Sequence, residues 1–121
     1  MKTPDLSNTP TPDLIREFTE LAIQQSYAEA KGEQEKLNNF LFLMFDVVKE
    51  LKARNSRDHL AVLFEHPVPF VRMQAACSAY NAIPDKARPV LEALYARKLQ
   101  PEAGWSGMTL AAHDKGWAVK D

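Results

Sequence analysis

The residues best suited to metal chemistry in this 121-residue chain are three histidines, His59, His66 and His113. Helical zinc sites use two histidines four residues apart, or a Glu-x-x-His pair, because those spacings bring both ligands to one face. His59 and His66 are seven residues apart, and His113 stands alone near an expected helix end, where the helix dipole favours a cation. We therefore expect no metal site.

The single cysteine, Cys77, lies in a run of small residues that extends from Ala75 to Ala79. A free cysteine in such a setting is usually a small core residue, since a nucleophilic cysteine needs exposure and a neighbouring base. One cysteine cannot form an internal disulfide, which favours a reducing compartment.

Paired carboxylates are a second route to catalysis, because one can act as a general acid and the other as a base. Asp46 and Glu50 share a helix face, and Glu33 and Glu35 are close in sequence. Lys49 beside the first pair makes a solvated charged face the better interpretation. The chain has only four glycines and no phosphate-binding loop or dinucleotide motif. We expect no catalytic residue, no cofactor and no enzymatic activity.

The charge balance also limits the partners that the chain can bind. It has 15 basic and 16 acidic residues, a net charge of -1. Nucleic-acid binding requires clustered basic residues, so no nucleic acid is expected. The amino-terminal stretch MKTPDLSNTPTPDL has no apolar region of the signal-peptide kind, and the longest apolar run, 40–45, is too short to cross a bilayer. We expect a cytoplasmic protein with no membrane partner.

Apolar residues recur at spacings of three and four along most of the chain, which predicts an all-α fold. Residues 1–10 are rich in Pro, Ser and Thr and are expected to form a flexible lead-in, followed by a single domain over 11–121. In the fifth helix the expected inward residues are Leu91, Leu94 and Tyr95. The expected helices cover residues 11–30, 33–54, 57–65, 69–82, 89–98 and 107–115.

Capping and helix-breaking residues set these boundaries. Thr11 is the expected N-cap of the first helix, and Gly32 ends it. Proline is awkward inside a helix, so a tight turn is expected over 85–88 and the regular helix starts at Pro89. Ser106 is the expected N-cap of the last helix, and Gly116 is its left-handed cap residue.

The second expected helix is apolar around most of its circumference. One stripe is formed by Leu37, Phe40, Leu41, Met44, Val48 and Leu51. Four further apolar residues lie off that stripe: Phe42, Leu43, Phe45 and Val47. Such a helix is covered on more than one side. It is therefore either the central element of the domain, the favoured interpretation, or part of a dimer interface.

The segment over 69–76 has a repeat-like pattern. Val71 is expected to be buried, Arg72 to lie one position outward, and Ala75 and Ala76 to allow a neighbouring helix to come close. This Pro-x-Val-Arg-x-x-Ala-Ala arrangement resembles the second helix of a HEAT-like repeat. The chain has room for about six helices in roughly three antiparallel pairs, which predicts HEAT-like helical hairpins in one right-handed layered bundle.

Several stretches together resemble the DUF2019 family, a bacterial family of domains of unknown function. They are Lys36-Leu37-Asn38-Asn39, His66-Pro67, Val71-Arg72, Ala75-Ala76, Pro84, Ala87, Val90-Leu91, Leu94, Met108-Thr109-Leu110 and Gly116. The resemblance covers about residues 14–116. The family pattern tends to carry a tryptophan where this chain has His113, with Trp117 just beyond.

The family resemblance implies a HEAT-like helical domain that acts through its surface. Small bacterial helical proteins of this kind sometimes serve as immunity partners of secreted toxins. The resemblance therefore implies a non-enzymatic protein-protein interaction domain, an immunity or adaptor protein that binds and occludes a bacterial toxin. A nucleic-acid-binding HEAT-like protein and a self-associating structural protein are the alternatives, and the chain is expected to be a monomer or a homodimer.

Four residues are candidate partner-binding residues: Arg72, Arg88, Trp105 and Trp117. Each also has a structural interpretation. Arg72 near a helix N-terminus can bond the carbonyls that end the previous helix. Trp105 with Leu110 matches a hydrophobic staple around Ser106, and Trp117 can fold back over the helix end. Arg88, Arg97 and Lys98 are the basic residues nearest Arg72 for the nucleic-acid alternative.

Overall fold

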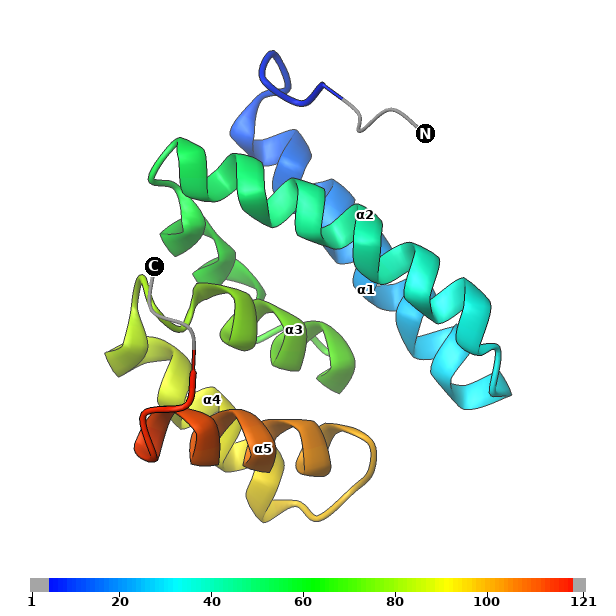
Figure 1. The fold of residues 1–121 in the computed structure, drawn as a ribbon, viewed down its shortest axis with the longest axis vertical. Helices are drawn as coiled ribbons and strands as arrows, with labels where there is room; N and C mark the ends of the chain where they lie inside the picture. The colour runs from blue at the N-terminus through cyan, green and yellow to red at the C-terminus, as the bar shows by residue number, and fades with distance from the viewer. Residues whose placement is uncertain (1–4, 119–121) are drawn as a thin grey trace. The chain divides into compact units, whose positions relative to one another are not determined.

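The computed structural model describes residues 5–118, and in that range the chain is all-helical, as predicted (Figure 1). The chain divides into two compact units, with the boundary between His59 and Leu60. The single domain and its HEAT-like stacking stay predictions. The helices are α1 (Thr11–Lys31), α2 (Gln34–Ala53), the 3-10 helix η1 (Arg57–Leu63), α3 (Pro69–Ala79), α4 (Pro84–Ala96) and α5 (Glu102–Asp114).

The first unit is a helical hairpin in which α1 packs against α2 (Figure 1). Gly32 ends α1 as predicted, and it does so in a left-handed conformation, with φ of 69°. The Glu33 amide then donates to the Ala28 carbonyl at 2.9 Å. Each helix buries one stripe. In α2, Val47 was expected off the stripe but is buried. The buried residues are Leu14, Phe18, Leu21, Ala22, Gln25 and Ala28 of α1, and Leu37, Met44, Val47 and Leu51 of α2.

The start of α1 differs from the prediction by one residue. Thr11 is already helical, and Pro10 is the cap residue, because the Pro10 carbonyl accepts the amides of Asp13 and Leu14 at 3.0 and 3.1 Å. The Thr11 hydroxyl caps no amide of the helix and instead accepts a hydrogen bond from Arg54.

The outer face of α2 corrects the favoured interpretation of this helix as a central element. Phe42 is 66% exposed and Phe45 is 60% exposed, and Leu43 is also exposed. Although α2 is apolar around most of its circumference, only one of its sides is buried. Among the described residues, no side chain buries Phe42, Leu43 or Phe45 on this face of α2.

The second unit is built from the end of η1 with α3, α4 and α5. Helix α3 packs against both α4 and α5, and those two pack against each other. Their shared core combines large side chains from all three helices with small ones that let the helix axes come close. Its buried residues are Phe70, Met73, Ala76, Tyr80, Ala87, Leu91, Leu94 and Leu110.

Helix α3 ends at Ala79, three residues before the predicted boundary. The amides of Ala82 and Ile83 both donate to the Ala79 carbonyl, which closes the turn. Ile83 is not helical, with φ of -139° and ψ of 62°, because the following Pro84 disfavours a helical residue before it. Val71 is fully buried as predicted, and Ala75 is fully buried as well.

Helix α4 begins at Pro84, and the predicted tight turn over 85–88 is wrong. Pro89 lies inside the helix, where it costs the chain one backbone hydrogen bond without ending the helix. Leu91 and Leu94 are buried as predicted, but Tyr95 is 56% exposed. Its ring lies against the backbone of Gly107 on α5, where a Cβ atom would be 2.6 Å from Tyr95 Cε2.

Helix α5 begins at Glu102, five residues before the predicted start, so Ser106 is inside the helix and is not its cap. Gly104, which was expected in a loop, is helical. At Gly104 and Gly107 neighbouring side chains occupy the space that a Cβ atom would take. The Gln100 side chain fills that space at Gly104 and accepts the Gly104 amide at 3.0 Å. The helix closes at Gly116, with φ of 75°, as predicted.

None of the helices in residues 5–118 is both long enough and apolar enough to cross a membrane.

Candidate functional site

An open groove of about 570 Å³ lies in the first unit, between α1, α2 and the segment before α1. The lining residues, which we call the acidic groove, are Leu6, Thr9, Asp13, Leu14, Arg16, Glu17, Glu20, Leu43, Asp46 and Val47. Its volume falls within the range of ordinary ligand sites. Its lining combines apolar residues with charged ones, and it is the strongest candidate for a binding site among the described residues.

The charges of the acidic groove are unbalanced. Asp13, Glu17 and Glu20 follow one another on α1 at spacings of four and three, so they lie along one face of that helix. Asp46 adds a fourth carboxylate from α2. The single cation, Arg16, pairs with Asp13 at 3.0 Å and is largely exposed. The groove thus has a net excess of negative charge and favours positively charged groups.

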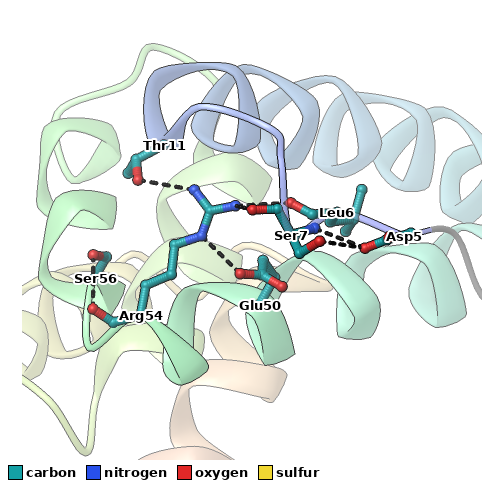
Figure 2. A network of polar contacts seen from close by, with 7 residues as sticks. All are labelled: Asp5, Leu6, Ser7, Thr11, Glu50, Arg54 and Ser56. Atoms are coloured by element: carbon teal, nitrogen blue, oxygen red, sulfur yellow. Dashed lines mark hydrogen bonds and ion pairs between the residues drawn. The ribbon is translucent and has the colours of Figure 1, made fainter.

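Arg54 holds the segment before α1, which supplies Leu6 and Thr9 to the groove lining, through a network of polar contacts (Figure 2). Its Nη2 donates to the Leu6 carbonyl at 2.7 Å and to the Ser7 carbonyl at 3.3 Å, and its Nη1 donates to Thr11 Oγ1 at 3.3 Å. Its Nε pairs with Glu50 Oε2 at 2.7 Å, and only 21% of each of these two side chains is exposed. A planar guanidinium can make all of these contacts at once because its donors point in several fixed directions.

The contacts of Arg54 place the lead-in segment along the end of α2. Ser7 also donates from its amide and its hydroxyl to Asp5 Oδ1, at 3.0 and 2.7 Å. The pKa of Asp5 is lowered because both hydrogen bonds favour the carboxylate. The flexibility predicted for residues 1–10 stays a prediction, and residues 1–4 lie outside the described range.

The four sequence-predicted partner-binding residues all lie in the second unit, away from the acidic groove in sequence and in element. Arg72 donates from Nη1 to the His66 carbonyl at 2.7 Å and to the Pro67 carbonyl at 3.3 Å. These are the carbonyls between η1 and α3, so the structural interpretation of Arg72 is confirmed. Its contact with a partner stays a prediction.

Arg88 is the centre of a polar cluster on the second unit. It makes a two-point contact with Asp114, at 2.8 and 3.0 Å, and donates to the Tyr80 hydroxyl at 3.1 Å. Glu92 Oε2 lies 3.4 Å from Arg88 Nε. These hydrogen bonds raise the pKa of Arg88 and lower the pKa of Asp114. Its guanidinium is already occupied by its own chain, and the role of Arg88 in partner binding stays a prediction.

The two tryptophans have different surroundings. Trp105 lies inside α5 and packs on Phe70, with ring centroids 5.5 Å apart, so the predicted hydrophobic staple around Ser106 is wrong. The Trp117 amide donates to the Ala112 carbonyl at 2.7 Å, which confirms the predicted backbone cap. Its ring is 71% exposed, with Lys115 Nζ 4.7 Å from the centroid. Partner contacts of either tryptophan stay a prediction.

The histidines and the cysteine have structural contacts. His113 stacks on Tyr80, with ring centroids 3.8 Å apart, so an aromatic ring occupies the position where the family pattern has tryptophan. His66 Nδ1 accepts the Val68 amide at 3.1 Å. Burial raises the pKa of the Cys77 thiol, and its contact with Thr109 Oγ1 at 3.4 Å opposes that only in part.

No group of three or more potential metal ligands comes together within residues 5–118.

The acidic groove was not identified from the sequence. The spacing of Asp13, Glu17 and Glu20 was visible as a charged helix face, but solvated faces of this kind are common. What makes it a groove is the placement of Leu6 and Thr9 beside α2, which depends on Arg54 and on residues more than 40 positions apart.

The comparisons with known proteins agree with the fold. The DUF2019 domain of unknown function matches residues 12–114. The crystal structure of the protein RPA1889 from Rhodopseudomonas palustris CGA009 is similar to this chain, with 35% identity and a TM-score of 0.93 over 98% of this chain and 99% of that one. No curated protein matches the chain. A family match over most of the chain and a close structural relative together lead to one conclusion: the chain belongs to the DUF2019 family.

Proposed function

We propose that this protein is a non-enzymatic protein-binding domain whose acidic groove takes a basic, partly apolar segment of a partner protein. The observation that carries the proposal is the composition of the groove lining. It contains four carboxylates, one guanidinium that is already paired, and apolar residues that include Leu43 and Val47. A segment with lysine or arginine on one side and apolar residues on the other complements both features.

Charge complementarity favours this occupant over a neutral one. Charges at an interface mainly raise the association rate and select the partner, while apolar contacts slow its dissociation. Binding is therefore expected to weaken as salt is added, because exposed charges are screened over roughly 10 Å at about 0.1 M salt.

In its finer form, the proposal is that the protein acts as an immunity or adaptor protein and occludes a bacterial toxin. Support comes from the resemblance of the family to small helical immunity partners. Occlusion needs only a surface that fits the partner, so it requires no catalytic group. A toxin partner of this kind would present its basic segment to the acidic groove.

A first experiment uses a synthetic amphipathic peptide of alternating lysine and leucine clusters as the probe. We expect its titration to shift the amide resonances of Thr9, Leu43 and Asp46 in NMR spectra. The double variant Glu17→Lys with Glu20→Lys should lose this binding. Shifts spread evenly over the protein would contradict the proposal.

The matched control makes the same charge change outside the groove. Asp58 and Glu65 are exposed acidic residues that do not line it. The double variant Asp58→Lys with Glu65→Lys therefore has the same net charge as the groove variant but should still bind the peptide. Equal loss of binding in both variants would mean that net charge alone is responsible.

A second experiment tests the function in the native host. Affinity purification of the tagged protein should recover one partner in stoichiometric amount, and the Glu17→Lys with Glu20→Lys variant should recover much less of it. Inhibition of a toxic activity of that partner by the purified protein would support the finer proposal. Failure to recover any stoichiometric protein partner would overturn the protein-binding function.

A further inference from the structure

The outer face of α2 carries six exposed residues at alternating spacings of three and four. They are Glu35, Asn38, Phe42, Phe45, Lys49 and Lys52. This spacing places them along one stripe of the helix, as in the seam of a coiled coil. The stripe lies opposite the buried stripe of the same helix, which includes Met44 and Leu51. We call the six residues the outer seam.

The chemistry of the outer seam changes along the helix. Its acidic residue, Glu35, is at the start of α2, and its two lysines are near the end. Phe42 and Phe45 occupy the middle, with ring centroids 6.5 Å apart in an edge-to-face arrangement. Two large aromatic side chains exposed side by side, with polar residues on both sides, are typical of the centre of an interface.

We propose that α2 of a second copy of the chain packs antiparallel on the outer seam, around a two-fold axis that passes between Phe42 and Phe45. In this register Phe42 of each copy meets Phe45 of the other. Glu35 of one copy meets Lys52 of the other, and Asn38 meets Lys49. Every residue of the outer seam thus faces a residue that it can pack against or pair with.

The charge pattern favours a second copy because it complements itself when the helix is reversed. A two-fold interface uses the same surface on both partners, so it requires such self-complementarity. A parallel arrangement in the same register would place Glu35 on Glu35 and Lys52 on Lys52, and like charges at an interface select against that arrangement.

The dimer is expected to be weak. Its contact is one pair of helices with four phenylalanine rings at the centre, which falls in the class of small, reversible interfaces. Apart from these rings the seam is polar. It shares no residue with the lining of the acidic groove, so partner binding and self-association can be tested separately.

Sedimentation velocity of the full chain from about 1 µM to about 500 µM tests the self-association, since that range covers weak dimers. We expect the sedimentation coefficient to rise with concentration and the rise to be absent in Phe42→Glu and in Phe45→Glu. Circular dichroism should show unchanged helix content, because both side chains are exposed. A chain that stays monomeric to the highest concentration, or a dimer that persists in both variants, would overturn the proposal.

Control variants place the same new charge on exposed apolar residues elsewhere. Val62 is 73% exposed and Met108 is 72% exposed, and neither belongs to the outer seam. Val62→Glu and Met108→Glu should dimerise like the unchanged chain. Loss of the dimer in these controls would place the interface elsewhere.

Charge exchange and cross-linking test the antiparallel register. Glu35→Lys should weaken the dimer roughly tenfold, because both copies lose an ion pair and gain a repulsion, and adding Lys52→Glu should restore it. In a Cys77→Ala background, Asn38→Cys and Lys49→Cys should cross-link when mixed but not separately. Cross-linking of Asn38→Cys with itself would show a parallel dimer and overturn the register.

Discussion

At the scale of single residues, the arginines show why charged side chains are hard to place from sequence. Arg72 bonds carbonyls only five and six residues away, and the sequence predicted that type of contact. Arg88 bonds Asp114 across 26 positions and Arg54 bonds Leu6 across 48. Local pattern carries no information on such distant partners, so neither contact could be predicted.

The Arg88 contact predicts a dependence of stability on pH. The pKa of Asp114 is lowered from its ordinary value of 3.8, first because Arg88 donates hydrogen bonds to the carboxylate. A lowered folded-state pKa contributes stability that is present above pH 3.8 and is lost as pH falls through the lower folded value. We expect the free energy of unfolding, from urea titrations between about pH 2 and pH 5, to fall less steeply in Asp114→Asn.

An NMR titration of the Asp114 carboxyl identifies the cause of this effect. In Arg88→Met its pKa should return towards the ordinary value, since the donor is removed. An Asp114 pKa that is the same with and without Arg88 would contradict the assignment.

At the scale of elements, the sequence predicted helices well where periodicity and breakers agreed. The ends of α1 and α2 lie within one residue of their predicted positions, because Gly32 breaks the helix where the apolar pattern also pauses. α5 starts five residues before the predicted position, because Pro101 and Gly104 were interpreted as loop residues and Ser106 as the N-cap. Gly104 leaves space for the Gln100 side chain, and Gly107 leaves space for the Tyr95 ring. These contacts are visible only in the packed structure.

The close approach of Tyr95 to Gly107 predicts a coupling between the two positions. Alanine is a better helix former than glycine by roughly 0.5–1 kcal/mol, but in Gly107→Ala the new Cβ displaces the Tyr95 ring. We expect urea denaturation to show a gain of about that size only in a Tyr95→Ala background, and little or no gain in the unchanged chain. Equal gains in both backgrounds would mean that Tyr95 does not restrict this position.

At the scale of the whole molecule, charge and exposed surface decide which partners are plausible. The net charge of -1 was visible in the sequence and disfavoured nucleic acid from the start. The uneven distribution of that charge was not visible, because the groove combines carboxylates from α1 with one from α2. The sequence left open that the apolar face of the second helix belongs to a dimer interface, but burial was the favoured interpretation, and Phe42 and Phe45 are exposed.

Nucleic-acid binding is the whole-molecule alternative that this charge distribution argues against. Asp114 offsets the charge of Arg88, and the donors of Arg72 are engaged by carbonyls, so two of the four basic residues suggested by the sequence are already held by the chain itself. We expect no shift of duplex DNA in a gel titration at low salt, where such binding is strongest. A salt-sensitive shift would overturn this expectation and revive the nucleic-acid alternative.

The position of Leu6 couples the acidic groove to the end of α2. Leu6 lines the groove, and its carbonyl accepts a hydrogen bond from Arg54 near the end of α2. An occupant that immobilises Leu6 is expected to strengthen the contacts of Arg54, and thermodynamic reciprocity then requires that weakening those contacts also loosens the occupant. Amide hydrogen exchange at the last turn of α2 would therefore report on a ligand that never touches it.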